Sequence, residues 1–246
     1  MVFLNLSKMN LSIIIPVFNE SENISNLLIE ISEALSTYNH EILVIDDSST
    51  DSTIEVLKSI KQSNENLRIL SHSENYGQSN AIKTGISSSK HDVIVTIDGD
   101  GQNDPRDIPI LVEEYVKRNI NYPRVMIAGY RYSRKDSFLK RFSSKYANML
   151  RNFLLKDNVP DTGCGLKVFD KKSFLELPFF NHIHRYLPAL FIAQGGKVFS
   201  VKVSHRPRVK GVSKYGFHNR FWVGIHDLLG VFWLQKRSKK NSFKEI

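Results

Sequence analysis

The sequence predicts an α/β fold in which a mainly parallel sheet is flanked by helices. Short β-branched runs alternate with helically spaced apolar residues through the first half, which is the pattern of successive strand–helix units. The 246 residues are 41% hydrophobic and 24% charged, enough apolar material for one large domain. This composition excludes a disordered, collagenous or coiled-coil chain.

The first strand is expected at residues 11–16, because LSIIIP is a short run of β-branched residues. A helix should follow over residues 24–35, where apolar side chains recur every three or four positions. Further elements are expected as strands at 41–46, 67–70, 93–98, 125–128 and 197–203, and as helices at 53–61 and 77–88. Four strand–helix units in a row predict a sheet of the nucleotide-binding type.

The net charge favours an anionic partner. Lysine and arginine number 34 against 25 acids, giving +9, which suits nucleic acid, phosphate or a lipid surface. No RNP, KH or helix-turn-helix pattern is present, so we expect no nucleic-acid partner. Cys164 is the only cysteine, so the chain has no internal disulfide and no thiolate cluster for zinc, which fits a cytoplasmic location.

Acidic side chains follow two of the predicted strands. Ligands of such sheets collect at the carboxyl ends of the strands, where Asp98-Gly-Asp100 and Asp46-Asp47 occur. Two carboxylates at positions i and i+2 stay ionised most easily beside a divalent cation, and oxygen ligands suit Mg²⁺ or Mn²⁺. The amide oxygen of Gln102 is a further hard ligand. An isolated DGD is more often a solvated turn, but the second acidic strand end favours the metal interpretation.

A metal-bound nucleoside diphosphate explains both the acidic strand ends and the basic second half. Asp46 is placed to accept a hydrogen bond from the ribose or base, while metal and arginines hold the pyrophosphate. The chain has neither G-x-G-x-x-G after the first strand nor G-x-x-x-x-G-K-[ST], so neither a dinucleotide fold nor a P-loop is indicated.

Seven motifs in register carry a family resemblance. They are IIIPVFNE, EILVIDDSSTDST, NYGQSNAIKTG, VIVTIDGDGQNDP, AGYR, DTGCGLKVF and HRPRVKGVSKYG. Together, and in order from about Leu11 to Trp233, they resemble glycosyltransferase family 2, of GT-A fold. Within it the sequence is similar to the dolichyl- and polyprenyl-phosphate sugar transferases, the branch of dolichol-phosphate mannosyltransferase.

The resemblance implies roles for particular residues. Arg131 would face the phosphates between donor and acceptor, and Asp161 would act as a base or an orienting carboxylate. Arg208 and Lys214 would close over the diphosphate as a lid; otherwise RVKGVSK is a basic solvated loop. The implied site is Pro16, Asn19 or Glu20, Asp46, Asp98, Arg208 and Lys214 for the nucleotide sugar, Asp100 and Gln102 for the metal, Asp98, Arg131 and Asp161 for catalysis, and Arg131, Arg141 and Ser144 for the acceptor phosphate.

The implied reaction is inverting transfer of a sugar from GDP-mannose or a UDP-sugar to a polyprenyl or dolichyl phosphate. Such a phosphate monoester is already mostly dianionic near neutral pH, with a second pKa of about 6, so cationic positioning matters more than a base. The alternative is a family 2 enzyme that acts on a hydroxyl of a cell-surface glycan or lipopolysaccharide, which requires a dedicated base.

The end of the chain is expected to act at a membrane surface. Residues 217–234 place many aromatic side chains on a short helix, and a basic run follows. We therefore divide the chain into a catalytic domain, 1–216, and an amphipathic interfacial extension, 217–246, peripheral to the cytoplasmic face. No run is long enough to span a bilayer. By pattern alone, the helix could equally belong to the core.

Overall fold

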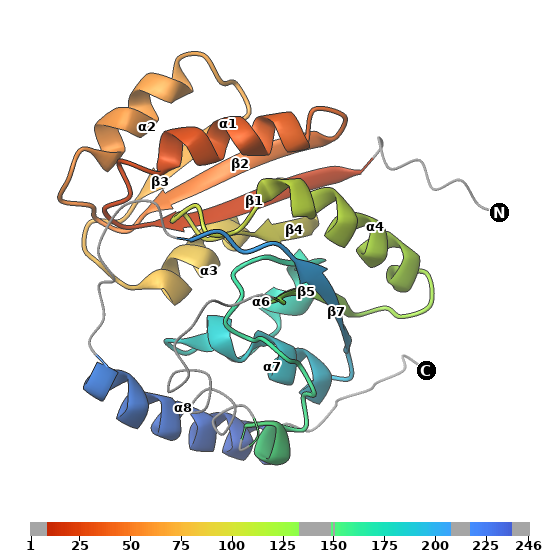
Figure 1. Ribbon diagram of the computed structural model, residues 1–246. Coiled ribbons are helices and arrows are strands. Elements are labelled where there is room, and N and C mark those ends of the chain that lie inside the picture. The colour runs from red at the N-terminus through yellow and green to blue at the C-terminus, as the bar shows by residue number, and fades with distance from the viewer. Residues whose placement is uncertain (1–8, 133–148, 150, 208–216, 238–246) are drawn as a thin grey trace, which may run out of the picture.

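The computed structural model describes residues 9–132, 149, 151–207 and 217–237, and gives only the backbone of 217–223. A seven-stranded sheet of order β3-β2-β1-β4-β6-β5-β7 runs through its centre (Figure 1). The strands are β1 (Asn10–Val17), β2 (Asn39–Asp46), β3 (Leu67–Ser71), β4 (Val93–Thr96), β5 (Val125–Arg131), β6 (Lys167–Asp170) and β7 (Lys197–Val203).

Helices cover both faces of the sheet. Leucine, isoleucine and valine side chains form one buried cluster beneath α1, α2 and α4, and a second beneath α3, α6 and α7 (Figure 1). The helical segments are α1 (Ile24–Ala34), α2 (Thr53–Lys61), α3 (Gln78–Ser88), η2 (Pro105–Asp107), α4 (Ile108–Asn119), α6 (Lys171–Leu175), η3 (Ile183–Arg185), α7 (Leu187–Ala193) and α8 (Phe217–Arg237).

The predicted α/β class and its strands are confirmed, although β2 begins two residues earlier, β5 continues to Arg131, β4 is shorter than expected, and the structure contains one additional strand. The strand expected at 93–98 ends at Thr96, although the backbone N–H of Ile97 still donates to the carbonyl of Ile14 at 3.1 Å. The additional strand is β6, which lies antiparallel between β4 and β5 and aligns Lys167 with Thr96 on one side and Ala128 on the other. The remaining strand pairs are parallel.

Helix α8 packs on the α7 side of the molecule (Figure 1). Leu228 and Val231 are buried in the second cluster, whereas Leu229 and Trp233 are 54% and 57% exposed. The Tyr186 hydroxyl donates to the carbonyl of Gly224 at 3.1 Å. Across the described ranges, every helix is too short or too polar to cross a bilayer.

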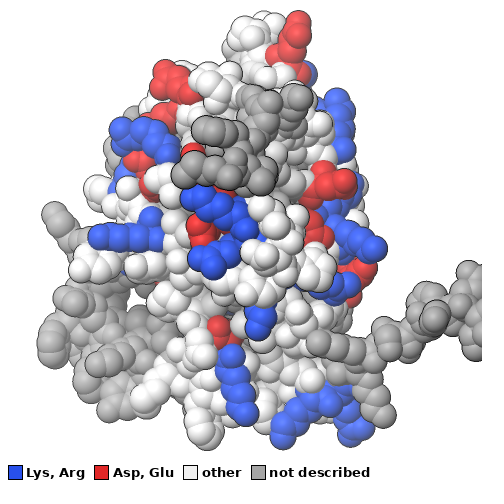
Figure 2. Space-filling model, turned by 90° about the vertical axis from the view of Figure 1, so that its right-hand side faces the viewer, with Lys and Arg blue, Asp and Glu red and all other residues white. Residues whose placement is uncertain are grey.

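The surface charge is mixed on the face that carries α4 and β7. Lysine and arginine side chains lie interspersed with acids there rather than in one basic patch (Figure 2). Arg118, for example, pairs with Glu114 one helical turn earlier. Among the described residues of this face, therefore, lysine and arginine do not form the continuous basic surface that a nucleic acid backbone requires.

Candidate active site

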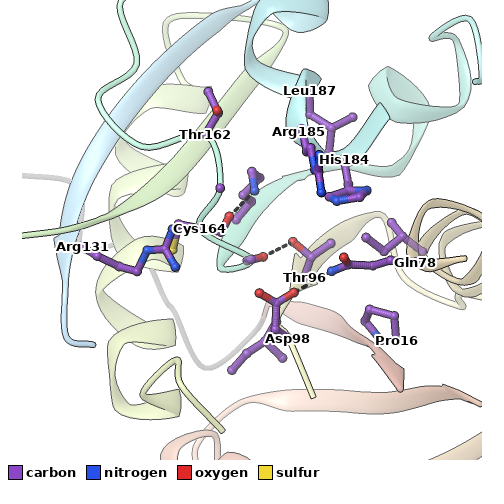
Figure 3. A pocket seen from close by; sticks show the side chains of 15 residues that line it. Pro16, Gln78, Thr96, Asp98, Arg131, Thr162, Cys164, His184, Arg185 and Leu187 are labelled. Carbon is purple, nitrogen blue, oxygen red and sulfur yellow. Dashed lines mark hydrogen bonds between the residues drawn. The ribbon is translucent and has the colours of Figure 1, made fainter. Parts of the chain in front are cut away.

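A cavity of about 300 Å³ opens where the parallel strands β1, β4 and β5 end (Figure 3). Sheets of this kind bind ligands at the carboxyl ends of their strands, where loops diverge and leave a crevice. In Figure 3, Arg131 enters from one side, His184 and Arg185 from the other, and Asp98 from below. Of the predicted site residues in the described part of the chain, Pro16, Asp98 and Arg131 line this cavity.

Asp98 lies on the cavity floor, just beyond the end of β4. Its Oδ1 accepts a hydrogen bond from Nε2 of Gln78 on α3 at 2.8 Å. A Cβ atom on Gly165 would lie 2.3 Å from the Asp98 carboxyl carbon, so only glycine fits beside this acid. Burial and the nearby charge of Asp100 raise the pKa of Asp98 to about 6, although Lys167 and Arg131 oppose the shift.

Asp100 and Gln102 follow on the turn after Asp98. The backbone N–H of Gln102 donates to Oδ1 of Asp100 at 3.1 Å, which holds the turn closed. The described residues contain no group of three His, Cys, Asp or Glu side chains arranged for a metal. Mg²⁺ is often held by only one or two carboxylates together with substrate phosphates and water, so this donor set fits a divalent cation that arrives with a diphosphate.

Arg131, at the end of β5, forms a two-point ion pair with Asp161. Its Nε lies 2.7 Å from Oδ2 and its Nη2 lies 2.9 Å from Oδ1, and both side chains are largely buried. A bidentate pair of this kind fixes the plane of the guanidinium. Both Asp161 oxygens are thereby engaged with the arginine at one side of the cavity.

The other predicted nucleotide residues build the loops beside the cavity. Oδ1 of Asn19 accepts the backbone N–H of Thr50 at 2.7 Å, and Asp46 accepts the Ser71 hydroxyl at 3.1 Å. Glu20 is buried and accepts a hydrogen bond from Nδ2 of Asn23. Asn19 thus joins the loop after β1 to the loop after β2, Asp46 joins the ends of β2 and β3, and Glu20 bonds within its own loop. None of the three lines the cavity itself.

Three polar lining residues lie outside the predicted site. They are Gln78 on α3, Lys167 at the start of β6, and Arg185 at the end of η3. Gln78 and Lys167 lie within motifs of the family resemblance, whereas Arg185 lies in HIHRYLP, outside the seven motifs. His184-Arg185-Tyr186 nevertheless resembles an element of the polyprenyl-phosphate branch that could fix the acceptor or the sugar. Four predicted residues, Arg141, Ser144, Arg208 and Lys214, lie outside the described residues.

His184, next to Arg185, ties η3 to α3. Its Nδ1 lies 2.7 Å from the hydroxyl of Ser79. Burial, with a smaller contribution from Arg185, lowers the pKa of His184 well below its ordinary value. The imidazole is therefore neutral at physiological pH, and it serves here as a hydrogen-bonding group.

Comparison with known proteins agrees with this architecture. Residues 12–177 match the sequence model of glycosyl transferase family 2. The dodecaprenyl-phosphate galacturonate synthase of Rhizobium johnstonii is 33% identical over 245 residues, covering 97% of this chain and 71% of that protein. The undecaprenyl-phosphate 4-deoxy-4-formamido-L-arabinose transferase of Pectobacterium carotovorum is 29% identical over 85% of this chain, which spans only 63% of that relative.

Solved structures show the same fold at low sequence identity. Glucosyl-3-phosphoglycerate synthase of Mycobacterium tuberculosis, crystallised with Mg²⁺ and UDP, superimposes with a TM-score of 0.69 at 17% identity, covering 93% of this chain and 80% of that one. Mannosyl-3-phosphoglycerate synthase of Rubrobacter xylanophilus gives 0.68 at 17% identity, covering 96% and 77%.

The mixed, mainly parallel sheet is the GT-A fold of these solved structures, and its cavity lies at the strand ends beside the acids that follow β4. The family match covers most of the strands and their acidic ends. The chain belongs to glycosyltransferase family 2.

Proposed function

We propose that this enzyme transfers a sugar from a nucleoside-diphosphate sugar to the phosphate of a polyprenyl or dolichyl lipid. The observation that carries the proposal is the Arg131–Asp161 pair, which fixes a cation in the cavity that also contains Asp98. An anionic acceptor needs such a cation near the donor. The names of the Rhizobium and Pectobacterium relatives, which specify dodecaprenyl and undecaprenyl phosphate, support this assignment.

In the proposed reaction, an oxygen of the lipid phosphate attacks the anomeric carbon of the sugar. The bond from that carbon to the diphosphate breaks, the electron pair leaves with the nucleoside diphosphate, and the anomeric configuration inverts. A phosphate monoester with a second pKa of about 6 is already largely dianionic, so it needs no strong base. Arg131 supplies charge and orientation for this phosphate.

Asp161 acts as the orienting carboxylate in this scheme. Both of its oxygens accept hydrogen bonds from Arg131, the second also receives the Arg131 backbone N–H at 3.3 Å, and the pair is only 12–13% exposed. Bidentate pairing of this kind suits a carboxylate that orients a guanidinium. Transfer to a phosphate that is already ionised requires an oriented cation more than a base, which favours it over transfer to a glycan or lipopolysaccharide hydroxyl.

Asp100 and Gln102 would hold a divalent cation, with Asp98 beside the donor ribose or sugar. Mg²⁺ or Mn²⁺ supplies, when bound, charge that neutralises the departing diphosphate. Asp98 is held in place by Gln78 on one side and by the absence of a side chain at Gly165 on the other. This arrangement orients the carboxylate before substrate arrives, which lowers the cost of binding.

We further propose that α8 lies at the membrane surface and leads the lipid phosphate toward the cavity on the cytoplasmic face. Its inner side packs through Leu228 and Val231, while Leu229 and Trp233, one helical turn apart, expose large apolar surfaces. Lys236 and Arg237 end the helix and suit an anionic lipid surface. Peripheral binding through one helix face is consistent with these contacts.

The test is transfer of sugar by the full chain to undecaprenyl phosphate in vesicles, with Mn²⁺ or Mg²⁺ and a panel of UDP- and GDP-sugars. We expect a sugar-phosphoryl lipid as product and its reversible loss in EDTA. Replacing Arg131 with alanine should lower kcat/KM for the lipid by about 10²-fold or more, as expected when a preorganised charge is removed. Arg118→Ala, on the exposed face of α4, serves as the control.

Two results would contradict the proposal. One is normal turnover of undecaprenyl phosphate by Arg131→Ala. The other is transfer to a glycan hydroxyl with no product on undecaprenyl phosphate for any donor in the panel.

A further inference from the structure

Fixed cations outnumber acids in the wall of the cavity. Arg131, Lys167 and Arg185 line it, and Asp98 is the only lining acid among the described residues. Arg131 pairs with Asp161, and its remaining N–H donors are assigned to the acceptor phosphate. Lys167 and Arg185 therefore give the rest of the cavity a positive charge that calls for an anionic group.

Lys167 is buried within the sheet, with only 4% of its surface exposed. Its register neighbours are Thr96 on β4 and Ala128 on β5. The side chain two positions along β6, Phe169, belongs to the core cluster beneath α3 and α7. Because side chains alternate along a strand, Lys167 points to that same face, at the edge where the cavity begins.

The ammonium of Lys167 has spare donor capacity. It donates to the carbonyl of Cys164, and no acid forms an ion pair with it in the described part of the chain. An ammonium carries three donors. Burial lowers the pKa of Lys167, although the charges of Cys164 and Asp98 oppose the shift. Keeping a buried cation without a paired acid costs stability, which a bound anion would offset.

Arg185 is held on a segment anchored from two sides. Ser79 of α3 contacts His184, and Asp227 of α8 lies 2.9 Å from Nδ1 of His182. Within the described residues, no acid pairs with the Arg185 guanidinium. Its five N–H donors are thus left available at the cavity wall, on a backbone that is already fixed.

We propose that Lys167 and Arg185 form an anion subsite for a carboxylate on the donor sugar, so that the substrate class is a nucleotide uronic acid. The inference rests on the proposed function. A carboxylate accepts charge-assisted hydrogen bonds from both groups, whereas a neutral hydroxymethyl group leaves two cations unpaired in the cavity.

The position of the subsite favours the donor sugar over the acceptor phosphate. Arg185 lies across the cavity from Arg131, the cation assigned to the acceptor (Figure 3). Helix α3 connects the Arg185 side of the cavity to Asp98, the carboxylate assigned to the donor. Gln78 of α3 contacts Asp98, and the next residue, Ser79, contacts His184 beside Arg185.

Lys167 interacts more strongly with the charge of Asp98, the carboxylate assigned to the sugar, than with the charges of Asp161 and Arg131. Both residues of the subsite are therefore placed toward the sugar.

The first measurement compares donors that differ only at the carboxylate. Binding of UDP-galacturonate and UDP-galactose, UDP-glucuronate and UDP-glucose, and GDP-mannuronate and GDP-mannose is measured by calorimetry with Mn²⁺ and without lipid. We expect the uronate of at least one pair to bind about 10-fold or more tightly than its neutral partner, the range for hydrogen bonds to charged groups. Equal binding within all three pairs, or preference for the neutral sugars, would overturn the inference.

The second measurement uses variants of the subsite. Lys167→Met and Arg185→Gln should each reduce the preference for the uronate while leaving the Kd of the neutral partner nearly unchanged. Lys197→Met, an exposed lysine on β7, is the matched control. If Lys167→Met does not fold, Arg185→Gln and the wild-type donor preference still decide the question.

Transfer assays separate this inference from the proposed function. If the variants raise KM for undecaprenyl phosphate and leave donor preference intact, the subsite binds the acceptor phosphate and the uronate assignment is wrong. If the wild type prefers uronates but transfers none of them to undecaprenyl phosphate, the proposed acceptor is wrong and the carboxylate subsite stands.

Discussion

Asp47, in the first half of the molecule, and Lys167 and Arg185, in the second, differ in how the protein satisfies their charge. In the first half, acids that follow β2 are satisfied within the protein: Asp47 accepts the backbone N–H groups of Tyr76 at 3.0 Å and Gly77 at 2.7 Å. It also contacts Nδ1 of His72 at 2.7 Å. In the second half, Lys167 and Arg185 line the cavity without an acid partner in the described residues.

This difference separates residues that hold the loops of the site together from residues that bind the substrate. An acid with several short hydrogen bonds holds loops together and has little capacity left for a ligand. A cation at a cavity wall without a partner keeps its donors for a substrate. Asp47 therefore contributes mainly to the shape of the site, whereas Lys167 and Arg185 keep hydrogen-bond donors for a ligand. Asp98 differs from Asp47, because it lines the cavity, accepts a side-chain hydrogen bond from Gln78 and has a raised pKa.

The largest effect on activity should come from placing a side chain at Gly165, which lies against Asp98. Gly165→Ala puts a Cβ 2.3 Å from the Asp98 carboxyl carbon, so Asp98 must move. We expect kcat/KM to fall by about 10²-fold or more, since a displacement of about 1 Å in a site can cost that much. Gly230→Ala on α8, where a Cβ meets nothing within 4 Å, is the control. Full activity of Gly165→Ala would mean that Asp98 does not need its present position.

Substitution of the adjacent acids Asp46 and Asp47 should affect different properties: donor binding for Asp46 and stability for Asp47. Asp47→Asn removes a charge that accepts hydrogen bonds at the start of α3, and should lower the free energy of unfolding by about 2–4 kcal/mol. Asp46→Asn loses longer contacts, to the Ser49 N–H at 3.3–3.4 Å, and should cost less than about 1 kcal/mol.

Urea denaturation and donor calorimetry together test this pair of variants. Asp46→Asn should weaken donor binding by about 10-fold, because Asp46 is assigned to the ribose or base. If Asp46→Asn were instead the less stable variant, the distinction between Asp47 as a structural acid and Asp46 as a donor-binding acid would be wrong.

The smallest effect concerns Glu41, a satisfied acid remote from the site. Burial raises the pKa of Glu41, but hydrogen bonds from Ser12, the Lys90 N–H and Arg68 outweigh it, and the net pKa is lowered from 4.5. A lowered pKa stabilises the fold above the unfolded value and loses that contribution as pH falls through the folded value. Glu41→Gln should therefore cost about 1–2 kcal/mol at pH 7.

The stability difference between wild type and Glu41→Gln should shrink below about pH 4.5, the ordinary value for glutamate. Urea denaturation between pH 3 and pH 7 measures it. Glu114→Gln, which removes the exposed helical pair with Arg118, should change stability by about 0.5 kcal/mol or less at any pH. A Glu41→Gln difference independent of pH would show that the carboxylate charge is not the stabilising feature.

The parallel strands could be predicted from the sequence, whereas the antiparallel strand β6 could not. Runs such as SIIIPV and EILVID are β-branched and buried, so their positions follow from composition alone. In contrast, β6 has only four residues, begins with a lysine and follows Gly163 and Gly165, which resembles a loop. Its burial comes from lying between β4 and β5, a pairing that no local pattern encodes.

The same reasoning explains which site residues the sequence could predict. Pro16, Asp98 and Arg131 line the cavity because the carboxyl ends of parallel strands meet at one edge. Gln78 and Arg185 come from helical segments, and Lys167 from the beginning of an antiparallel strand. A lysine beside apolar residues is usually solvated, and only the three-dimensional packing makes this one part of the site.

The insertion of β6 also sets an order for biosynthesis. Strands β1 to β4 form a contiguous sheet from residues that leave the ribosome first, whereas β5 pairs only with β6 and β7, which are both made later. Non-local pairings of this kind form slowly. A nascent chain therefore acquires the acidic edge of its catalytic centre early and the cationic edge last, so translation products that stop before β6 carry half of the centre and lack Lys167 and Arg185.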